Sequence, residues 1–261
     1  MSTDPAQLKI TDLAQQFRQD LRLEGLVVAF PDRFGGVSEA PFDSLNLGFS
    51  TGDDPGAVLE NRRRLIGALN ISPESVIVPG QVHGCEVLHA TEHDAGEGFA
   101  GPSKKLAGHD VVCIESPGIF ALSLTADCPL VTVIDPRERR VGIAHCGWRG
   151  TAAGALRPLL DFSGSTSDLF AVISPGIRGP QYVVGSEVIE AVSPLPGAQQ
   201  AISGNTLDIT TILLQTLLQA GLSMDRIALD PRCSHQDSHL FSYRRDRGET
   251  GRGGCLVGWK F

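Results

Sequence analysis

The chain has 261 residues and a formal net charge of −8 at pH 7. That length fits one large domain or two small ones, and it can bury a core that needs no disulfide or metal to fold. A nucleic-acid-binding surface would be basic, so the acidic balance argues against nucleic acid as a partner. Small anions are still compatible ligands, because arginines can make the field inside a cleft positive.

No apolar stretch approaches the ~20 residues that are needed to cross a bilayer, so no membrane partner is expected. The polar segment Met1–Ile10 also lacks the basic-then-apolar pattern of a secretory signal. Both observations predict a cytoplasmic protein, in which cysteines stay reduced. The six cysteines lack the close spacing of a disulfide framework, and one of them is a candidate metal ligand.

Four elements are predicted before residue 70. Apolar residues at helical spacing predict an amphipathic helix over Gln7–Leu23. The apolar run Leu26–Phe30 predicts a strand, and the segment Phe34–Asp54, rich in Gly, Ser, Asp and Pro, predicts a long loop. Apolar residues on one face predict a second helix over Ala57–Leu69.

Six short runs rich in β-branched residues follow, and each predicts a strand. They are Val76–Val78, Val87–Leu88, Val111–Ile114, Phe120–Leu124, Val131–Ile134 and Val141–Ala144. A turn over Pro136–Glu138 lies between the last two runs, which are therefore expected to pair as a hairpin.

The last part of the chain predicts two more helices and a strand. A helix is expected to open near Thr151 and to be kinked or shortened by Pro158. A strand is expected over Leu169–Ile173, and a clear helix over Thr206–Ala220, ended by Gly221. Many strands with few intervening helices favour an α+β fold with a mixed sheet.

Three short polar motifs follow predicted strands, where a rigid scaffold presents reactive side chains. They are Gln81-Val82-His83-Gly84, Thr125-Ala126-Asp127-Cys128-Pro129 and His145-Cys146-Gly147-Trp148-Arg149-Gly150-Thr151. The two imidazoles of His83 and His145 and the thiolate of Cys128 suit a zinc ion and leave a coordination position for water or substrate. Because the three lie far apart in sequence, hydrogen-bonded histidines and a buried thiol remain the alternative.

Further short motifs accompany these three along the chain. They are Leu45-Asn46-Leu47-Gly48, Gly52-Asp53-Asp54, Asn61-Arg62, Ser174-Pro175-Gly176-Ile177, Tyr182, Val184-Gly185, Cys233, Phe241-Ser242-Tyr243-Arg244-Arg245 and Thr250-Gly251-Arg252. Together the motifs resemble the laccase-domain or YfiH family, over nearly the whole chain beyond about residue 25. The chain departs from the family pattern at His109, at Cys146, where alanine is usual, and at Ser234, where threonine is common.

The resemblance implies a single α+β domain of four layers, an α/β/β/α sandwich with mixed sheets, over residues 25–261. Residues 1–24 are expected to form a helical lead-in. It also implies a zinc site made by His83, Cys128 and His145, to which copper could bind in vitro. Members of the family are credited with phosphorolysis of adenosine, inosine and methylthioadenosine and with adenosine deamination. Purine nucleosides and phosphate are therefore the expected ligands, and a homodimer is one assembly left open.

Phosphorolysis requires a group that holds phosphate, and the fork of an arginine matches phosphate oxygens. Arg149 is the first candidate, because it lies between a proposed ligand and the start of a helix. Arg62, Arg244 and Arg245 are second candidates, and each could instead form a surface ion pair. The aromatic ring of Tyr243 is a candidate to stack on the purine base. The remaining substrate-binding candidates that the resemblance implies are Asn46 and Gln81.

Deamination requires an activated water and a group that transfers protons. Asp127, which precedes Cys128, is the catalytic candidate for proton transfer, with Asp110 as the other choice. Either aspartate could instead be buried, where it would cap a helix or orient a ligand histidine.

Three other functions are weighed against this one. A Cys-His hydrolase or amidase, such as a peptidoglycan-editing enzyme, would use Cys128 as nucleophile and His145 as base. A multicopper oxidase needs about ten histidines with His-x-His pairs. This chain has seven histidines, no His-x-His pair and two methionines, so we reject that function. A non-catalytic metal-binding protein is the third alternative.

Overall fold

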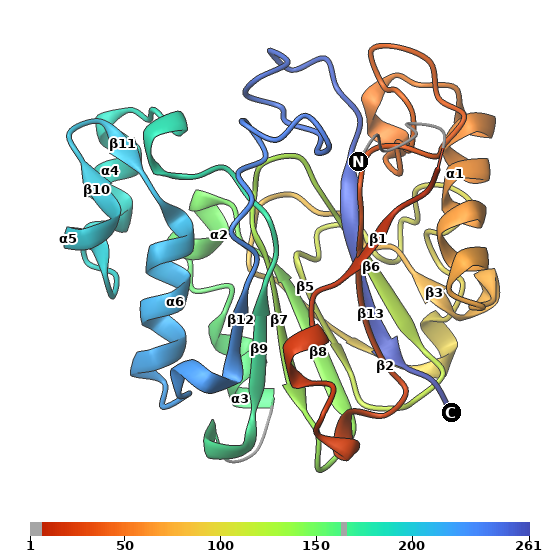
Figure 1. Ribbon diagram of the computed structural model, residues 1–261, viewed down its shortest axis with the longest axis horizontal. Helices are drawn as coiled ribbons and strands as arrows, with labels where there is room; N and C mark the ends of the chain where they lie inside the picture. The colour runs from red at the N-terminus through yellow and green to blue at the C-terminus, as the bar shows by residue number, and fades with distance from the viewer. Residues whose placement is uncertain (1–6, 163–165) are drawn as a thin grey trace.

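Two β-sheets lie face to face at the centre of the molecule, and helices cover their outer faces (Figure 1). The first sheet has five strands in the order β1-β2-β13-β6-β3, and the second has six in the order β12-β9-β7-β8-β5-β4. This computed structural model describes residues 7–162 and 166–261. Both sheets contain parallel and antiparallel pairs, so the predicted α+β sandwich of layers α/β/β/α is confirmed.

The strands of the first sheet are β1 (Ile10–Asp12), β2 (Leu26–Pro31), β13 (Gly253–Trp259), β6 (Phe120–Thr125) and β3 (Val76–Ile77). Those of the second are β12 (Ile227–Leu229), β9 (Phe170–Ile173), β7 (Leu130–Asp135), β8 (Arg140–His145), β5 (Val111–Ile114) and β4 (Val87–Ala90). A separate pair is formed by β10 (Ile202–Ser203) and β11 (Thr206–Leu207).

The α-helices are α1 (Pro55–Ala68), α2 (Trp148–Ala152), α3 (Arg157–Phe162), α4 (Ser186–Val192), α5 (Ala198–Ala201) and α6 (Ile209–Gln219). Short 3-10 helices lie at Gln15–Phe17, Leu21–Leu23, Phe49–Thr51, Pro73–Ser75, Glu92–Asp94, Thr166–Asp168, Gly179–Gln181 and Met224–Arg226. Helix α1 packs on the first sheet, whereas α2, α3 and α6 lie on the side of the second (Figure 1). No helix among the described residues is long and apolar enough to span a membrane.

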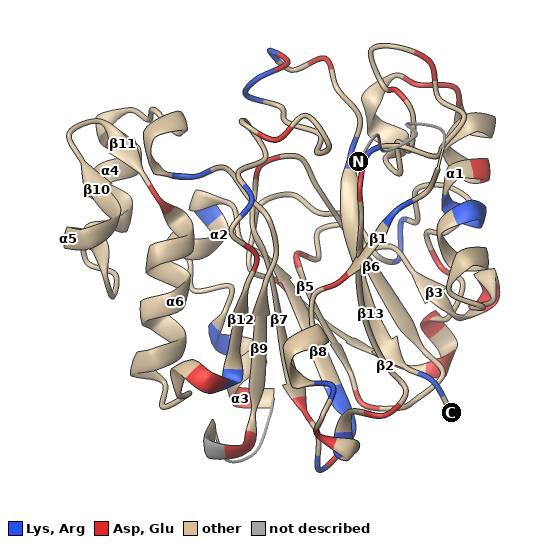
Figure 2. Cartoon of the chain, in the orientation of Figure 1, with Lys and Arg blue, Asp and Glu red and all other residues tan. Residues whose placement is uncertain are grey.

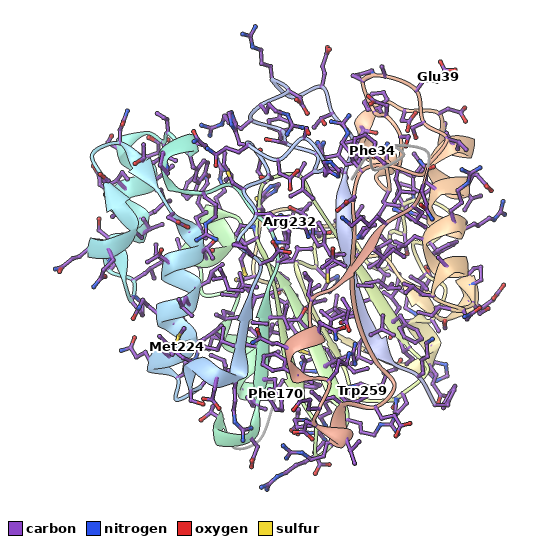
Figure 3. All side chains as sticks on the ribbon, in the orientation of Figure 1. Phe34, Glu39, Phe170, Met224, Arg232 and Trp259 are labelled. Carbon is purple, nitrogen blue, oxygen red and sulfur yellow. The ribbon has the colours of Figure 1, made fainter. Side chains whose placement is uncertain are left out.

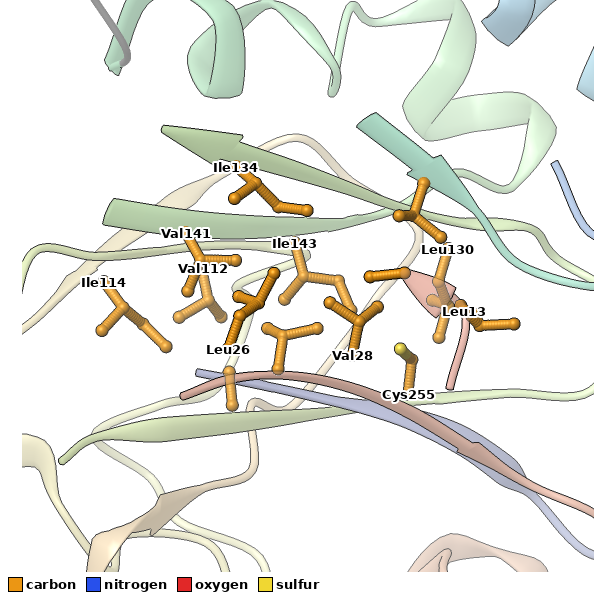
Figure 4. Packing of buried hydrophobic residues seen from close by; sticks show 14 of the residues in the cluster. Leu13, Leu26, Val28, Val112, Ile114, Leu130, Ile134, Val141, Ile143 and Cys255 are labelled. Atoms are coloured by element: carbon orange, nitrogen blue, oxygen red, sulfur yellow. The ribbon is translucent and has the colours of Figure 1, made fainter. Parts of the chain in front are cut away.

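Strand β2 shows why the strands read as unbroken apolar runs. Side chains alternate between the two faces of a strand, and both faces of this sheet are covered. Leu26 and Val28 enter the core between the sheets (Figure 4), whereas Val27 and Ala29 enter the core beneath α1. Side chains fill the space between the layers, and charged residues lie mostly at strand ends, in loops and on helices (Figures 2 and 3).

The predicted strands between residues 76 and 173 all form, within one to two residues of their expected ends. The predicted hairpin is confirmed, because β7 and β8 pair antiparallel and Asp135 lies opposite Arg140. Pro158 does not kink a long helix. The chain instead forms two short helices, α2 and α3, and Pro158 lies in the first turn of α3, where its missing N–H is not needed.

The helix predicted over Gln7–Leu23 is wrong. Residues 10–12 form β1, which pairs antiparallel with β2, and two 3-10 helices follow. Asp12 accepts bonds from the side chain of Arg18 and the backbone N–H of Ala14, which fixes the turn after the strand. Leu21 is 85% exposed, so the apolar spacing did not mark one buried face. The boundary between residues 1–24 and 25–261 stays a prediction, and residues 1–6 lie outside those described.

The helix predicted over Thr206–Ala220 begins later than expected. Thr206 and Leu207 form β11 and pair with β10 across a turn in which Gly204 has a φ of +59°. The Asp208 side chain then accepts a bond from the N–H of Thr210 and caps α6. A local strand pair, followed by a strong N-cap, shortened the predicted helix by three residues at its start.

Candidate metal centre

The centre lies where the chain passes from one sheet to the other. Strand β6 belongs to the first sheet and β7 to the second, so the turn that carries Cys128 crosses between them. The pairing of β7 with β8 places Leu130 opposite His145. The backbone N–H of His145 donates to the carbonyl of Asp110 at 2.8 Å, which brings Asp110, at the start of β5, beside it.

The structure brings His83, Cys128 and His145 together. Their ligand atoms all lie within 4.8 Å of one another, and no second group of this kind is found among the described residues. The imidazole of His83 is exposed, Cys128 is half-buried and His145 is buried. The three predicted ligands therefore form one cluster that is open to solvent on the side of His83.

Asp110 organises the cluster from behind. Its Oδ2 accepts bonds from the backbone N–H groups of Val82 and Gly84, and its Oδ1 accepts one from the N–H of His83, all at 2.8–2.9 Å. The same Oδ1 accepts the Nδ1–H of His145 at 2.8 Å. This bond leaves Nε2 of His145 as the metal-binding nitrogen, as in carboxylate–histidine–zinc arrangements.

Charges within the cluster favour its ionised forms. Burial raises the pKa of the Cys128 thiol, but the charge and hydrogen bonds of His145 and His83 outweigh burial and bring it to about 6. Burial lowers the pKa of His145, whereas the Cys128 thiolate and Asp110 raise it, to about 9. Burial likewise raises the pKa of Asp110, but its hydrogen bonds outweigh this and hold it below the usual value. The thiolate that zinc requires is therefore available at neutral pH.

Gly147 leaves room for the three donors. A Cβ at this position would lie 3.0 Å from Sγ of Cys128 and 3.1 Å from Cδ2 of His83. The backbone of Gly147 thus faces directly onto the cluster, and a side chain there would press on Cys128 and His83. Two imidazoles, one thiol and this side-chain-free space fit a tetrahedral zinc ion with one position left for another ligand.

Two arginines, each lying over an aromatic ring, flank the cluster. Arg149, on α2, lies over the ring of Trp148 at 4.4 Å, two residues after Gly147. Arg244 lies over the ring of Tyr182 at 5.0 Å and donates from Nη1 to the carbonyl of Val183. Both arginine side chains are exposed and can therefore meet an anion from solvent.

Tyr182 and Arg252 are residues to which sequence reasoning gave no role. Burial and the charge of Cys128 raise the pKa of Tyr182 to about 12, so its phenol is neutral at pH 7. Arg252 lies over the ring of Tyr243 at 5.4 Å. The chain has two tyrosines in all, and this scarcity was the signal that could have pointed to Tyr182. Tyr243, a predicted substrate contact, is 54% exposed.

Asp127 differs from its expected setting. It has a φ of +100° and is 9% exposed. Its Oδ1 accepts a bond from Oγ of Ser234, and its Oδ2 accepts one from the backbone N–H of Arg244. Neither a helix cap nor a ligand histidine is its partner.

Two predicted substrate-binding residues, Asn46 and Arg62, use their side chains to bind the loops beside α1. Asn46 is 0% exposed, and its side-chain amide binds Gly48, Thr51, Asp53 and the N–H of Arg252. Arg62 is 2% exposed, and its guanidinium donates to the carbonyls of Leu47, Gly98 and Phe99. These bonds hold the loops together, and we leave both residues out of the substrate-binding set.

Gln81 and Arg245 also bind backbone. The amide of Gln81 both donates to and accepts from the backbone of Leu124, and so joins the loop of His83 to the end of β6. Arg245 donates to the carbonyls of Ser234, Asp237 and Leu240 and pairs with the Asp246 carboxylate. The structure gives each a part in shaping the site, and we leave them out of the substrate-binding set too.

Several known proteins are similar to this chain in sequence and in fold. The model of the family described as multi-copper polyphenol oxidoreductase laccase matches residues 27–260. Purine nucleoside phosphorylase YlmD of Bacillus subtilis is 32% identical, over 99% of this chain and 96% of its own. Purine nucleoside phosphorylase YfiH of Escherichia coli is 35% identical, over 88% of this chain and 92% of its own.

Two solved structures match over most of both chains. The hypothetical protein YfiH of Bacillus licheniformis has a TM-score of 0.86 at 30% identity, over 91% of this chain and 94% of its own. YlmD of Geobacillus stearothermophilus has a TM-score of 0.83 at 32% identity, over 92% of this chain and 94% of its own. Sequence and structure agree over nearly the whole length, and the chain belongs to the laccase-domain family that includes YfiH and YlmD.

Proposed function

We propose that the protein is a zinc-dependent purine nucleoside phosphorylase that acts on adenosine, inosine and methylthioadenosine and deaminates adenosine as a side activity. The observation that carries this proposal is the convergence of His83, Cys128 and His145 within 4.8 Å. Relatives that match most of the chain are named purine nucleoside phosphorylases, which supports the reaction class. A cytoplasmic location and a homodimer stay predictions.

His83, Cys128 and His145 would hold the zinc ion. Zinc bound by three protein ligands supplies a Lewis acid and lowers the pKa of a water molecule, which is the chemistry that deamination requires. Asp110 orients His145 through the 2.8 Å bond to Nδ1 and holds the His83 loop through three backbone N–H groups. The chain's own contribution is therefore a fixed donor set that stays in place before substrate arrives.

Arg149 and Arg244 are the residues proposed to bind phosphate. Phosphorolysis forms a bond between a phosphate oxygen and C1′ of the ribose while the bond from C1′ to the purine breaks. The electron pair of the broken bond leaves with the base, so the sugar becomes cationic in the transition state. A phosphate held beside C1′ supplies the nucleophile and stabilises that charge. The exposed ring of Tyr243 is proposed to stack on the purine.

Chromatography of adenosine incubated with and without phosphate tests the proposal. Wild type should release adenine that depends on phosphate, together with some inosine or hypoxanthine. Cys128→Ala should lose both activities, whereas Cys85→Ala, a nearby thiol outside the cluster, should keep them. Product formation that survives in Cys128→Ala would move the reaction away from this cluster.

Arg149→Ala tests the phosphate contact separately. Loss of the guanidinium should raise the KM for phosphate by about tenfold, because charge-assisted bonds are the strong ones. Deamination, which uses no phosphate, should change less. Arg157→Ala is the matched control, since Arg157 lies on α3 with a side chain that is 84% exposed. An equal fall in both activities would contradict the assigned role.

A Cys-His hydrolase is the second candidate function, with peptidoglycan as one class of substrate. Hydrogen bonds join Asp110 to His145 and His145 to Cys128, as they join the orienting carboxylate, the base and the nucleophile of a catalytic triad. Metal analysis separates the two functions. One zinc per chain that is lost in Cys128→Ala supports the metal centre, whereas a metal-free protein inactivated by iodoacetamide supports the hydrolase.

A further inference from the structure

The side chain and the backbone carbonyl of Asp127 together bind three other segments of the chain. Ser234 Oγ donates to its Oδ1 at 2.6 Å, and the backbone N–H of Arg244 donates to its Oδ2 at 2.7 Å. The carbonyl of Asp127 accepts the N–H of Ile177 at 2.7 Å. Asp127 directly precedes Cys128, so these bonds link the turn that carries a ligand to the segments around Ile177, Ser234 and Arg244.

The bond to Arg244 fixes an exposed guanidinium as well as a backbone atom. The side chain of Arg244 extends over the Tyr182 ring at 5.0 Å and donates to the carbonyl of Val183. The next residue, Arg245, donates from Nη1 to the carbonyl of Ser234 at 2.8 Å. Segment 242–245 is thus bonded both to Asp127, through Arg244, and to Ser234, through Arg245.

A group that transfers protons must have its carboxylate aimed at the substrate. Each oxygen of Asp127 instead accepts a bond from a protein donor, so the hydroxyl of Ser234 and the backbone N–H of Arg244 set the orientation of the carboxylate. The side chain is also buried. We propose that Asp127 is a positioning residue that couples the Cys128 turn to the segment carrying Arg244, and that it does not transfer protons. The coupling to substrate binding rests on the function proposed above.

Two substitutions separate the two roles. Asparagine keeps both contacts, because its Oδ1 can accept the N–H of Arg244 and its Nδ2 can donate to the hydroxyl of Ser234. It cannot carry a proton between solvent and substrate. Glycine removes both contacts, yet it adopts the φ of +100° without strain. Asp127→Asn and Asp127→Gly therefore differ in hydrogen bonding and are alike in lacking an ionisable group.

Limited trypsin digestion of the zinc-loaded full chain, without substrate, measures the coupling directly. Cleavage after Arg244 and Arg245, located by mass spectrometry, should be about tenfold faster in Asp127→Gly, because segment 242–245 loses the bond that holds the backbone of Arg244. Asp127→Asn should stay within about threefold of wild type. Asp161→Asn, on the exposed face of α3, should match wild type. Equal protection of the segment in Asp127→Gly and wild type would overturn the proposal.

Steady-state kinetics with adenosine and phosphate give the second readout. In Asp127→Gly the KM for phosphate should rise by about tenfold, with a smaller change in kcat, and Asp127→Asn should restore the wild-type KM. A proton carrier would instead lose kcat equally in both variants, and that result would overturn the proposal. If wild type shows no phosphorolysis at all, the proposed function fails, while the digestion experiment still decides whether Asp127 holds the segment.

Discussion

The backbone of Gly147 and the sulfur of Cys128 lie so close that a methyl group on Gly147 would stand 3.0 Å from Sγ. Gly147 is the N-cap of α2 and has a φ of −65°, a value that any residue adopts. The preference for glycine is therefore steric and comes from Cys128 and His83 beside it. Strand β8 ends at His145, and Gly147 follows two residues later as the N-cap of α2, so the chain passes the cluster without a side chain there.

Gly147→Ala should fill that space and push apart Cys128 and His83. Because a Cβ contact of 3.0 Å forces neighbouring atoms to move, we expect zinc affinity to fall by about tenfold or more. Competition with a chromogenic chelator measures the change. Gly101→Ala is the control, since a Cβ there meets no atom within 4 Å. Unchanged zinc affinity in Gly147→Ala would show that the metal does not bind between these residues.

Asp110→Asn should loosen two ligands at once. The amide can accept fewer of the four bonds that Asp110 takes from Val82, His83, Gly84 and His145, and its NH₂ group would face backbone N–H groups. We expect zinc affinity to fall by about 10- to 100-fold, the usual effect of losing such a partner. The thermal midpoint should fall as well, because buried N–H groups lose their acceptor. Asp225→Asn, in the 3-10 helix Met224–Arg226 and exposed, serves as the control.

Arg62→Met should lower stability and leave substrate binding intact. Burial lowers the pKa of Arg62 to about 9, and the guanidinium satisfies the carbonyls of Leu47, Gly98 and Phe99. Removing these donors should reduce the free energy of unfolding by about 3 kcal/mol, measured by urea denaturation. Arg64→Met, at an exposed ion pair, should change it little. A raised KM for phosphate in folded Arg62→Met would return Arg62 to the substrate-binding set.

Alkylation of Cys128 by iodoacetamide should depend on pH in the metal-free protein. The thiolate is the reactive form, and the pKa of Cys128 lies near 6 where an ordinary thiol has 9. The rate should therefore be near its maximum at pH 7.5 and fall as the pH drops below 6. Zinc should protect the thiolate at every pH at which it binds. A rate that rises steadily up to pH 9 would show that His145 and His83 do not stabilise the thiolate.

Short runs rich in β-branched residues predicted most strands of the two sheets, because such runs are a property of the local chain. Runs such as Val111–Ile114 and Val131–Ile134 are buried at every position, since both faces of each sheet are covered. Gln7–Leu23 also has apolar spacing, yet its first part pairs with β2 as β1. Whether such a segment forms a helix or pairs as a strand depends on the part of the chain that lies beside it, and the segment's own sequence does not contain that information.

By itself, the sequence determined which residue types could bind zinc, His83, Cys128 and His145, because the side-chain chemistry of imidazole and thiolate is local. Only the tertiary structure decided that they meet. The register of β7 with β8 places His145 beside the turn that carries Cys128, and Asp110 holds the loop of His83, which lies 62 positions before His145. The tertiary structure also decided the partners of polar side chains. The side chains of Asn46, Arg62 and Arg245 bind backbone, Asp127 holds Ser234 and Arg244, and the ring of Tyr182 lies beneath Arg244, since burial and hydrogen bonding are properties of the folded surroundings.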